Sequence, residues 1–292
     1  MKKLIYLFLL LSFQSNAQPG WKWVQQFGDV ISSSSQGTPE LTFDMGTDQW
    51  GNVYVAGRVT EQYMRDSMGN ILFDSTTFLQ KKYNYGGLDL WVAKYAPDGT
   101  KLWHKFAGGG GNDEFFDMTI DPDGNCYIIG SLNNHTLNKP KDFNGNTLTN
   151  DKMYEFVAKI DANGNQVWHQ PFVGDTIMNY YVRFASVLTN VYIDRQDNIH
   201  CSFFGGSDFV LGPIRLFGQD TIAQGIHEAI FDQGGNYLGY NSFPFDGSNN
   251  LSYIPRAADI KLDKKGNYYL TTTFSQDTII TSSDTLTHVG FN

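Results

Sequence analysis

The chain has 292 residues, of which 41% are hydrophobic and 17% charged, and its 21 basic and 30 acidic residues give a formal net charge of −9. This acidic balance argues against binding to nucleic acid and to anionic membranes, because both repel a negatively charged protein. An aromatic content of 15% together with 30 glycines is typical of many strands joined by tight turns. No long stretch has apolar residues at the 3.6-residue spacing of an amphipathic helix, so almost no helix is expected.

The N-terminus has the order of a secretory signal peptide. Lys2 and Lys3 precede an apolar run over 4–11, and small and polar residues lead to Ala17, which predicts a signal peptide over 1–17. The run is shorter than the ~20 apolar residues that a membrane span needs. Cleavage lowers the count of basic residues from 21 to 19 against 30 acidic ones. We therefore expect an extracellular or cell-surface protein without a membrane span.

A turn followed by a strand recurs four times along the chain. The copies begin at Asp48, Asp121, Asp194 and Asp263, which are separated by 73, 73 and 69 residues, and three of them share the pattern Asp-x-x-Gly-Asn. A regular period of this kind indicates stacked copies of one structural unit.

A second motif lies between the copies of the first. Residues 91–103 and 156–168 both contain a strand, an Asx-Gly turn and a second strand that includes a tryptophan, and 228–238 is a degenerate copy. One unit therefore contains four strands. In the second unit they are expected at 116–120, 125–131, 155–160 and 166–172.

We expect an all-β fold, a β-propeller domain over 18–292 whose blades have four antiparallel strands. The blades are expected at about 41–108, 115–174, 184–243 and, incomplete, 256–292. Each complete blade is longer than the ~40–50 residues of a standard blade, because an insert separates its second and third strands. These inserts lie at about 58–88, 132–154, 205–226 and 275–290. They recur at one place in each blade, so they are expected to form a shared contact surface.

Both motifs resemble those of the bacterial secreted β-propeller repeat family of the SBBP type. Units of that family run Asp-x-x-Gly-Asn-x-Tyr-x-x-Gly and then Phe-Val-Ala-Lys, an apolar residue, Asp-x-x-Gly and Trp, and the resemblance covers essentially the whole mature chain. It implies a seven-bladed secreted or surface propeller with no assigned chemistry, often followed by a sorting domain for type IX secretion. The third unit departs most, because Asp197 stands where the other units have the turn glycine.

The ends of the chain do not coincide with unit boundaries. Residues 21–28, which include Trp23, match the fourth strand of a unit and are expected to be an orphan strand that completes the last blade. The sequence stops half way through its fourth unit. We expect an N-terminal fragment of a longer type IX-secreted protein or an interrupted reading frame. A four-bladed ring closed by 23–27 is the alternative.

The two cysteines, Cys126 and Cys201, occupy positions two residues apart on equivalent strands of different units. Such strands are expected to be too far apart for the Cα separation of about 5.5–6 Å that a disulfide prefers. Both are therefore predicted to be free, buried thiols.

No catalytic residue, metal site or cofactor is predicted, and the binding residues are unknown. The turns at 121–125 and 161–165 resemble calcium loops, but glycine is fourth rather than sixth and no glutamate follows at the twelfth position. Hairpin turns explain the same residues. The histidines show no metal-ligand spacing: His104, His135, His169, His200, His227 and His288.

Trp103 and Trp168 are interpreted as aromatic residues packed between blades. The sequence around the first, Asp98-Gly99-Thr100, differs in spacing from the Asp-box of sialidases and in order from the tryptophan-docking motif of quinoprotein propellers.

Six Asp-Ser/Thr-hydrophobic triplets resemble an O-glycosylation sequon of exported bacterial proteins; simple recurrence with the inserts is the alternative. The triplets are 66–68, 74–76, 175–177, 220–222, 277–279 and 284–286.

The sequence therefore predicts a secreted, non-enzymatic scaffold or adhesion module that contacts an unknown protein or glycan through its inserts. The alternative is a polysaccharide-binding or polysaccharide-active propeller, because fold does not determine function.

Overall fold

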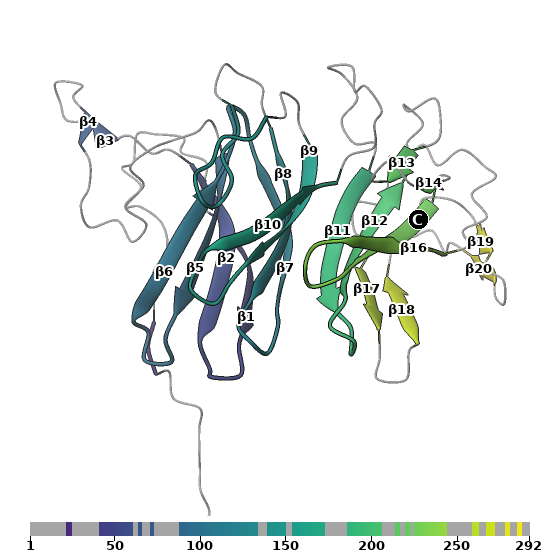
Figure 1. The fold of residues 1–292 in the computed structure, drawn as a ribbon, viewed down its shortest axis with the longest axis horizontal. Coiled ribbons are helices and arrows are strands. Elements are labelled where there is room, and N and C mark those ends of the chain that lie inside the picture. Colours follow the sequence, from purple (N-terminus) through teal and green to yellow (C-terminus); the bar gives the residue numbers. More distant parts are fainter. Residues whose placement is uncertain are drawn as a thin grey trace, which may run out of the picture.

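The protein is seen in a computed structural model, and its described residues form strands and turns (Figure 1). No helix occurs among them, as expected. The described residues are 22–24, 41–60, 64–65, 71–72, 88–133, 139–149, 154–172, 186–205, 214–216, 220–222, 225–243, 259–262, 267–271, 278–280 and 285–287.

Twelve of the strands form three antiparallel sheets of four strands each, and strands adjacent in a sheet are consecutive in the chain apart from short hairpins in the inserts. The first sheet contains β1 (Leu41–Thr47), β2 (Val53–Thr60), β5 (Leu88–Tyr95) and β6 (Lys101–Ala107). The second contains β7 (Glu114–Ile120), β8 (Cys126–Leu132), β9 (Tyr154–Ile160) and β10 (Gln166–Pro171). The third contains β11 (Ser186–Ile193), β12 (Ile199–Gly205), β15 (Gly225–Phe231) and β16 (Tyr237–Phe243).

Eight shorter strands form four two-stranded hairpins. They pair β3 (Met64–Arg65) with β4 (Ile71–Leu72), β13 (Ile214–Leu216) with β14 (Asp220–Ile222), β17 (Asp259–Leu262) with β18 (Tyr268–Thr271), and β19 (Thr278–Ile280) with β20 (Thr285–Thr287). The β3–β4 and β13–β14 hairpins, which belong to the first and third inserts, lie at the upper end of the molecule in Figure 1.

The four strands predicted in the second unit are confirmed by β7, β8, β9 and β10, with ends shifted by two residues at most. The inserts do separate the second and third strands of each sheet. The orphan strand over 21–28 is not seen where it is described, because Trp23 and Val24 lie outside any strand. The rest of that segment, like the predicted signal peptide over 1–17, lies outside the described residues.

The hairpin turns are built by the Asp-x-x-Gly-Asn motif itself. The side chain of Asp121 accepts hydrogen bonds from the backbone N of Asn125 at 2.8 Å and from its Nδ2 at 2.7 Å, and Gly124 takes the φ of 77° that closes the turn. The same backbone pattern recurs at 48–52, 142–146, 161–165, 194–198 and 232–236. This confirms the interpretation of these residues as hairpin turns, because the aspartate oxygens bind the turn's own N–H groups.

In the third sheet this turn forms without glycine. Asp197 adopts a φ of 61°, and its N–H donates to the carbonyl of Asp194 at 3.2 Å as the turn glycines do. A side chain in this left-handed region is strained, although aspartate tolerates it better than most residues.

Asp197→Gly is therefore expected to stabilise the protein by about 0.5 kcal/mol, since relief of strain outweighs the added flexibility of the unfolded chain. Urea unfolding measures the change. Gln196→Gly, in the same turn but without a positive φ, serves as the control and should destabilise by about 0.5–1 kcal/mol. Equal effects of the two substitutions would contradict this account of the turn.

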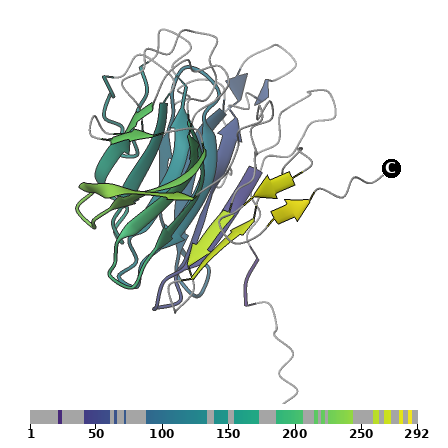
Figure 2. The same cartoon turned by 90° about the vertical axis from the view of Figure 1, so that its right-hand side faces the viewer.

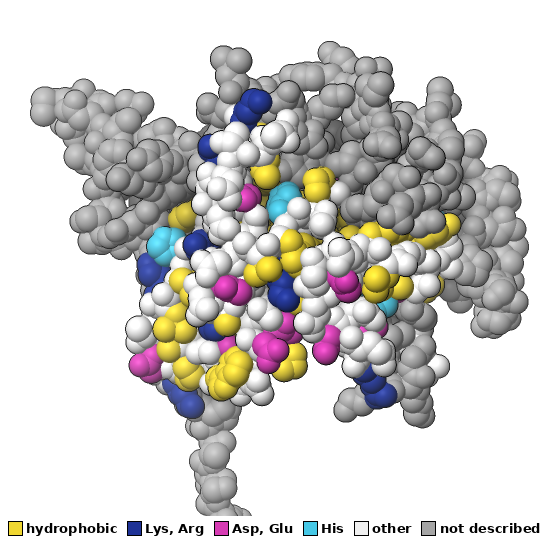
Figure 3. Space-filling model, viewed as in Figure 1, with side chains coloured by type: hydrophobic (Ala, Val, Ile, Leu, Met, Phe, Trp, Pro, Cys, Tyr) yellow, Lys and Arg dark blue, Asp and Glu magenta, His cyan; other side chains and the backbone are white. Residues whose placement is uncertain are grey.

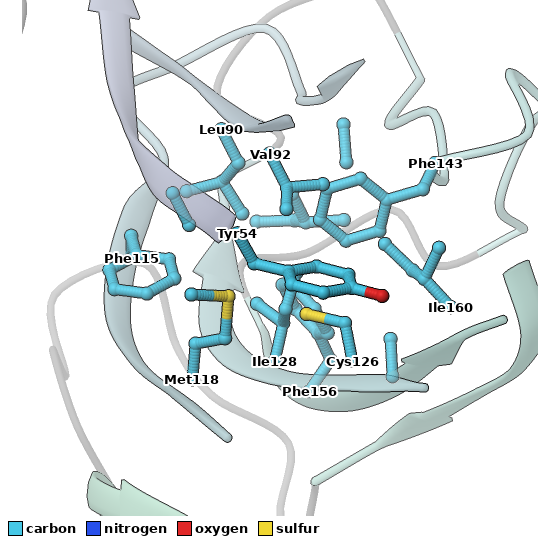
Figure 4. Close-up of a cluster of buried hydrophobic side chains, with 14 residues drawn as sticks. Tyr54, Leu90, Val92, Phe115, Met118, Cys126, Ile128, Phe143, Phe156 and Ile160 are labelled. Carbon is cyan, nitrogen blue, oxygen red and sulfur yellow. The ribbon is translucent and has the colours of Figure 1, made fainter. Parts of the chain in front are cut away.

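The sheets pack face to face, and Figure 2 shows the third sheet in front of the second. The first and second sheets enclose one apolar cluster (Figure 4), to which Tyr54 and Leu90 come from the first sheet and Ile128 and Phe156 from the second. A second cluster joins the second and third sheets in the same way. Each sheet thus covers the apolar face of its neighbour, which is how stacked units bury a continuous core.

The cysteines lie in different clusters, Cys126 in the first and Cys201 in the second. Both are buried and free, as predicted, and burial raises the pKa of each thiol well above its usual value. Neither is therefore a reactive thiolate at neutral pH.

Candidate functional site

A tryptophan of each of the first two sheets rests on the hairpin of the next sheet. Trp103 in β6 donates from Nε1 to the carbonyl of Ala162 at 3.0 Å, in the β9–β10 hairpin. The ring covers Gly164 so closely that a Cβ there would lie 2.9 Å from Trp103 Cδ2. Trp168 makes the same contact with the third sheet, donating to the carbonyl of Gln233 at 3.0 Å.

This confirms the interpretation of both tryptophans as residues packed between units, although each is half-buried rather than fully enclosed. Trp23 repeats the contact at the first sheet, where it donates to the carbonyl of Pro97 at 3.1 Å and lies over Gly99. The glycine partner does not follow from the sequence motif, because the motif lies within one hairpin whereas the contact joins two sheets.

A buried lysine reinforces each of the two later contacts. Lys94 lies 3.3 Å from a carboxylate oxygen of Asp48 in its own sheet, and its Nζ donates to the carbonyl of Ala162 at 3.2 Å. Lys159 donates in the same way to the carbonyl of Gln233 at 3.3 Å. The lysine of the repeated motif is thus a connection between sheets.

The first strands of the sheets are also connected. Asp44, at a bulge in β1, accepts a hydrogen bond from the backbone N of Met118 in β7 at 3.2 Å. Asp117, at the equivalent bulge in β7, accepts one from the backbone N of Val191 in β11 at 2.8 Å. Neighbouring sheets are therefore joined at both edges.

The third sheet lacks the tryptophan and the lysine on its face that is turned away from the second sheet. Where the first two sheets pair Trp103 with Lys94 and Trp168 with Lys159, the third pairs Gly239 with Ile230. No described atom lies within 4 Å of a Cβ built on Gly239. The tryptophan connection and the lysine connection are therefore both absent from this sheet.

The connection through the first strand is also changed. At the bulge of β11, Asn190 occupies the position that Asp44 and Asp117 have in β1 and β7. Its Oδ1 accepts no hydrogen bond from the described residues, although its side chain is buried.

A cluster of polar side chains occupies the same face of the third sheet. Glu228, which is completely buried, stands where the other sheets have valine at 92 and 157. His200 lies between two carboxylates, with Nδ1 3.0 Å from Glu228 Oε2 and Nε2 3.1 Å from Asp194 Oδ2. The hydroxyl of Tyr192 donates to Glu228, and Asn241 Nδ2 donates to it at 3.1 Å.

The carboxylates favour the charged form of His200. Burial lowers the pKa of His200, but hydrogen bonding to Glu228 and Asp194 and their charges outweigh it, so the pKa is raised above its usual value. Burial raises the pKa of Glu228, but the hydrogen bonds from His200 and Tyr192 lower it overall. His200 thus lies between two carboxylates in a hydrogen-bonded network within the third sheet.

This arrangement does not activate a nucleophile. Both imidazole nitrogens of His200 face carboxylates, so neither offers a lone pair to a hydroxyl group. Ser202, directly opposite Glu228 in the sheet, is buried, and its Oγ has no hydrogen-bond partner among the described residues. The network therefore has the chemistry of an internal ion pair.

The remaining described histidines are packed against aromatic rings or paired. His169 stacks on Phe156 with ring centroids 4.8 Å apart, and burial lowers its pKa to about 4. His104 lies edge-on to Phe106, and burial lowers its pKa as well. His227 Nδ1 is 2.8 Å from a serine hydroxyl, that of Ser242. His135 and His288 lie outside the described residues.

Within the described part of the chain, no three histidine, cysteine, aspartate or glutamate residues form a group that could hold a metal ion. The same residues include no helix long and apolar enough to cross a membrane.

Part of the second insert, 139–149, folds back against its own sheet. Phe143 is buried beside Phe156, and Gln166 donates from Nε2 to Asp142 at 2.8 Å and accepts at Oε1 from Phe143 N at 3.1 Å. This segment is held by internal packing, while 144–147 stay exposed. The predicted contact surface also includes the rest of the inserts. Most of those residues lie outside the described ones.

The side chains of the predicted glycosylation triplets also lie outside the described residues, although the backbone of 220–222 forms β14 and that of 278–279 and 285–286 belongs to β19 and β20. On the face seen in Figure 3, acidic, basic and apolar side chains are interspersed over the described surface. That face has no strip of a single charge.

No protein-family model and no curated protein matches the chain. Among solved structures, the crystal structure of the rhamnogalacturonan lyase YesW is similar to this chain, with a TM-score of 0.37 and 13% sequence identity. The similarity covers 89% of this chain and 44% of that one, so the chain spans less than half the length of the lyase.

Proposed function

We propose that the chain is part of a secreted, non-enzymatic β-propeller, a scaffold or adhesion module that holds its partner through the inserts. Three four-stranded antiparallel sheets, stacked face to face with their strands in chain order, support this architecture. The resemblance of both sequence motifs to the SBBP-type repeats supports it as well.

The observation that carries the proposal is the contact between a tryptophan and the next hairpin, made three times in one direction along the chain. Trp23, Trp103 and Trp168 each donate to a carbonyl of the hairpin that follows. Trp23 thus occupies, at the first sheet, the position that a fourth strand of a preceding sheet would hold. In a closed ring that sheet would be the last blade, completed by the N-terminal segment.

The polar cluster supports a non-enzymatic role. His200 is committed to Asp194 and Glu228, and the carboxylate of Glu228 is completely buried. A general acid or base has to reach its substrate within hydrogen-bond distance. The network acts in this proposal as a structural part of the third blade.

Export is tested by the N-terminus of the protein recovered from the producing bacterium. The mature chain is expected outside the cytoplasm and to begin at Gln18, which peptide mass spectrometry detects. Cytoplasmic protein that still carries Met1 would contradict export.

Binding is tested with the purified chain on arrays of plant and bacterial glycans and on immobilised proteins of the producing cell's surface. In two variants, a two-residue Asn-Gly turn replaces 66–86 of the first insert or 206–224 of the third. We expect these variants to keep the unfolding midpoint of the parent protein and to lose most of its binding.

The same polysaccharides are then incubated with the parent protein, and new chain ends are measured. The proposal expects none. Release of oligosaccharides would instead establish the enzymatic alternative, and binding that survives both replacements would place the contact surface elsewhere.

A further inference from the structure

The sequence contains two Asn-Gly pairs, Asn144-Gly145 and Asn163-Gly164, and both lie in turns of the same kind. In each turn the glycine N–H donates to the carbonyl of the first aspartate at 2.9 Å, and the asparagine N–H donates to Oδ1 of that aspartate, also at 2.9 Å. The two glycines have φ values of 80° and 87°. The backbones of the two turns are therefore closely matched.

The side chains of the two asparagines differ in their contacts. Asn144 is held at both ends of its amide, because Nδ2 donates to the carbonyl of Gln166 at 3.0 Å and Oδ1 accepts from the backbone N of Gln166 at 2.9 Å. Asn163 is exposed, and its side-chain amide has no hydrogen-bond partner among the described residues. One amide is thus fixed in place, and the other is free to rotate about its side-chain bonds.

An asparagine that precedes glycine loses its side-chain amide more readily than other asparagines, because glycine has no side chain to hinder the approach of its backbone nitrogen. The nitrogen of Gly164 would form a bond to Cγ of Asn163. Its proton passes through solvent water to Nδ2, the bond from Cγ to Nδ2 breaks, and ammonia leaves a cyclic imide behind. Water then opens the imide at one of its two carbonyls and gives aspartate or isoaspartate. Overall, one water is consumed and one ammonia is released.

We propose that Asn163 is a site of deamidation in the folded protein and that Asn144 is protected. The imide forms only when Cγ of the asparagine reaches the next backbone nitrogen. The free amide of Asn163 can turn towards that nitrogen, whereas the two hydrogen bonds to Gln166 hold the amide of Asn144 away from it. The reacting N–H groups start from the same arrangement, since each donates to an aspartate carbonyl in its own turn.

The modification would act on the contact between the first and second sheets. Trp103 donates to the carbonyl of Ala162 and lies over Gly164, the two neighbours of Asn163 in the chain. Isoaspartate inserts a methylene group into the main chain between these neighbours, and either product adds a negative charge. The hairpin would then no longer fit the ring, so deamidation is expected to weaken this contact. The effect is independent of what the inserts bind.

The test follows both asparagines by peptide mass spectrometry while the wild-type protein is incubated at mildly alkaline pH. Deamidation raises the peptide mass, and chromatography separates isoaspartate from aspartate. In the folded protein, Asn163 should convert several-fold faster than Asn144. In urea, where both turns are lost, the two should convert at similar rates because each precedes glycine. Equal rates in the folded protein, or an Asn163 that stays intact while the chain in urea reacts, would overturn the proposal.

Two variants test the protection and the consequence separately. Gln166→Ala removes the side-chain hydrogen bonds to Asp142 and Phe143 that tie this turn to the hairpin, so Asn144 should convert faster than in the wild type. Asn163→Gln keeps an amide whose longer side chain forms the imide far more slowly, so its urea midpoint should stay constant during the incubation while that of the wild type falls. An unchanged rate at Asn144, or equal falls of the two midpoints, would contradict the proposal.

Discussion

Gly164→Ala is expected to destabilise the protein by about 3 kcal/mol. The residue takes a φ of 87°, which costs a non-glycine residue about 1 kcal/mol. Its new methyl group would lie 2.9 Å from Trp103 Cδ2 and push the ring off the hairpin, which adds about 1–3 kcal/mol of overpacking. The displaced ring would also lose its hydrogen bond to Ala162. Chemical unfolding followed by tryptophan fluorescence reports both the stability and the environment of the ring.

Gly145→Ala is the matched control. Gly145 has a φ of 80° in a turn of the same kind, but no described atom lies within 4 Å of a Cβ placed there. Only the backbone cost of about 1 kcal/mol is expected. If the two substitutions cost the same, the tryptophan contact does not stabilise the stack.

Glu228→Val is expected to cost about 3–5 kcal/mol, the usual effect of removing one partner from a buried ion pair. His200 would then keep only Asp194 as a charged partner, and the hydroxyl of Tyr192 would lose its acceptor. Valine fits this position in the two preceding sheets, so the loss would come from the unpaired groups rather than from the shape of the new side chain.

The loss should depend on pH. The raised pKa of His200 contributes stability that is present below its usual value of about 6.5 and disappears as the pH rises through its folded value. The lowered pKa of Glu228 contributes stability that is lost as the pH falls through its own folded value. The difference between wild type and Glu228→Val is therefore largest between these two folded pKa values and smaller on either side.

A double substitution tests whether His200 and Glu228 stabilise the protein as a pair. His200→Tyr combined with Glu228→Val gives the third sheet the residues that the first sheet has at 54 and 92. The double variant should be more stable than the sum of the single effects predicts, by at least about 1 kcal/mol. Additive losses would show that the two side chains act separately.

Local features of the fold could be predicted from the sequence. The Asp-x-x-Gly-Asn turns have their partners within five residues, so the pattern determines both hairpin and strands. The same reasoning could have found the turn at 142–146, since its residues Asp142-Phe143-Asn144-Gly145-Asn146 fit the motif. The sequence predicts only a loop or an extra hairpin within this insert, because the copy at Asp142 lies off the 73-residue period.

Contacts between units could not be predicted in this way. The partners Trp103 and Gly164 are each ordinary members of a hairpin, and their contact depends on how two sheets stack. Residues 228–238 could be identified as a degenerate copy of the second motif, but the pairing of Glu228 with His200 became visible only in the sheet.

Distances between spin labels test the central claim, that successive sheets stack through the same contacts. The labels are attached to cysteines that replace three exposed residues, each directly before the tryptophan position of β6, β10 or β16: Leu102, Val167 and Leu238. Their exposed fractions are 50%, 56% and 56%, and the native cysteines are buried and do not compete for the label. Pulsed electron paramagnetic resonance on pairs of labels should give equal distances for 102–167 and 167–238, and a longer distance for 102–238. Unequal neighbouring distances, or a 102–238 distance no longer than the others, would contradict a regular stack.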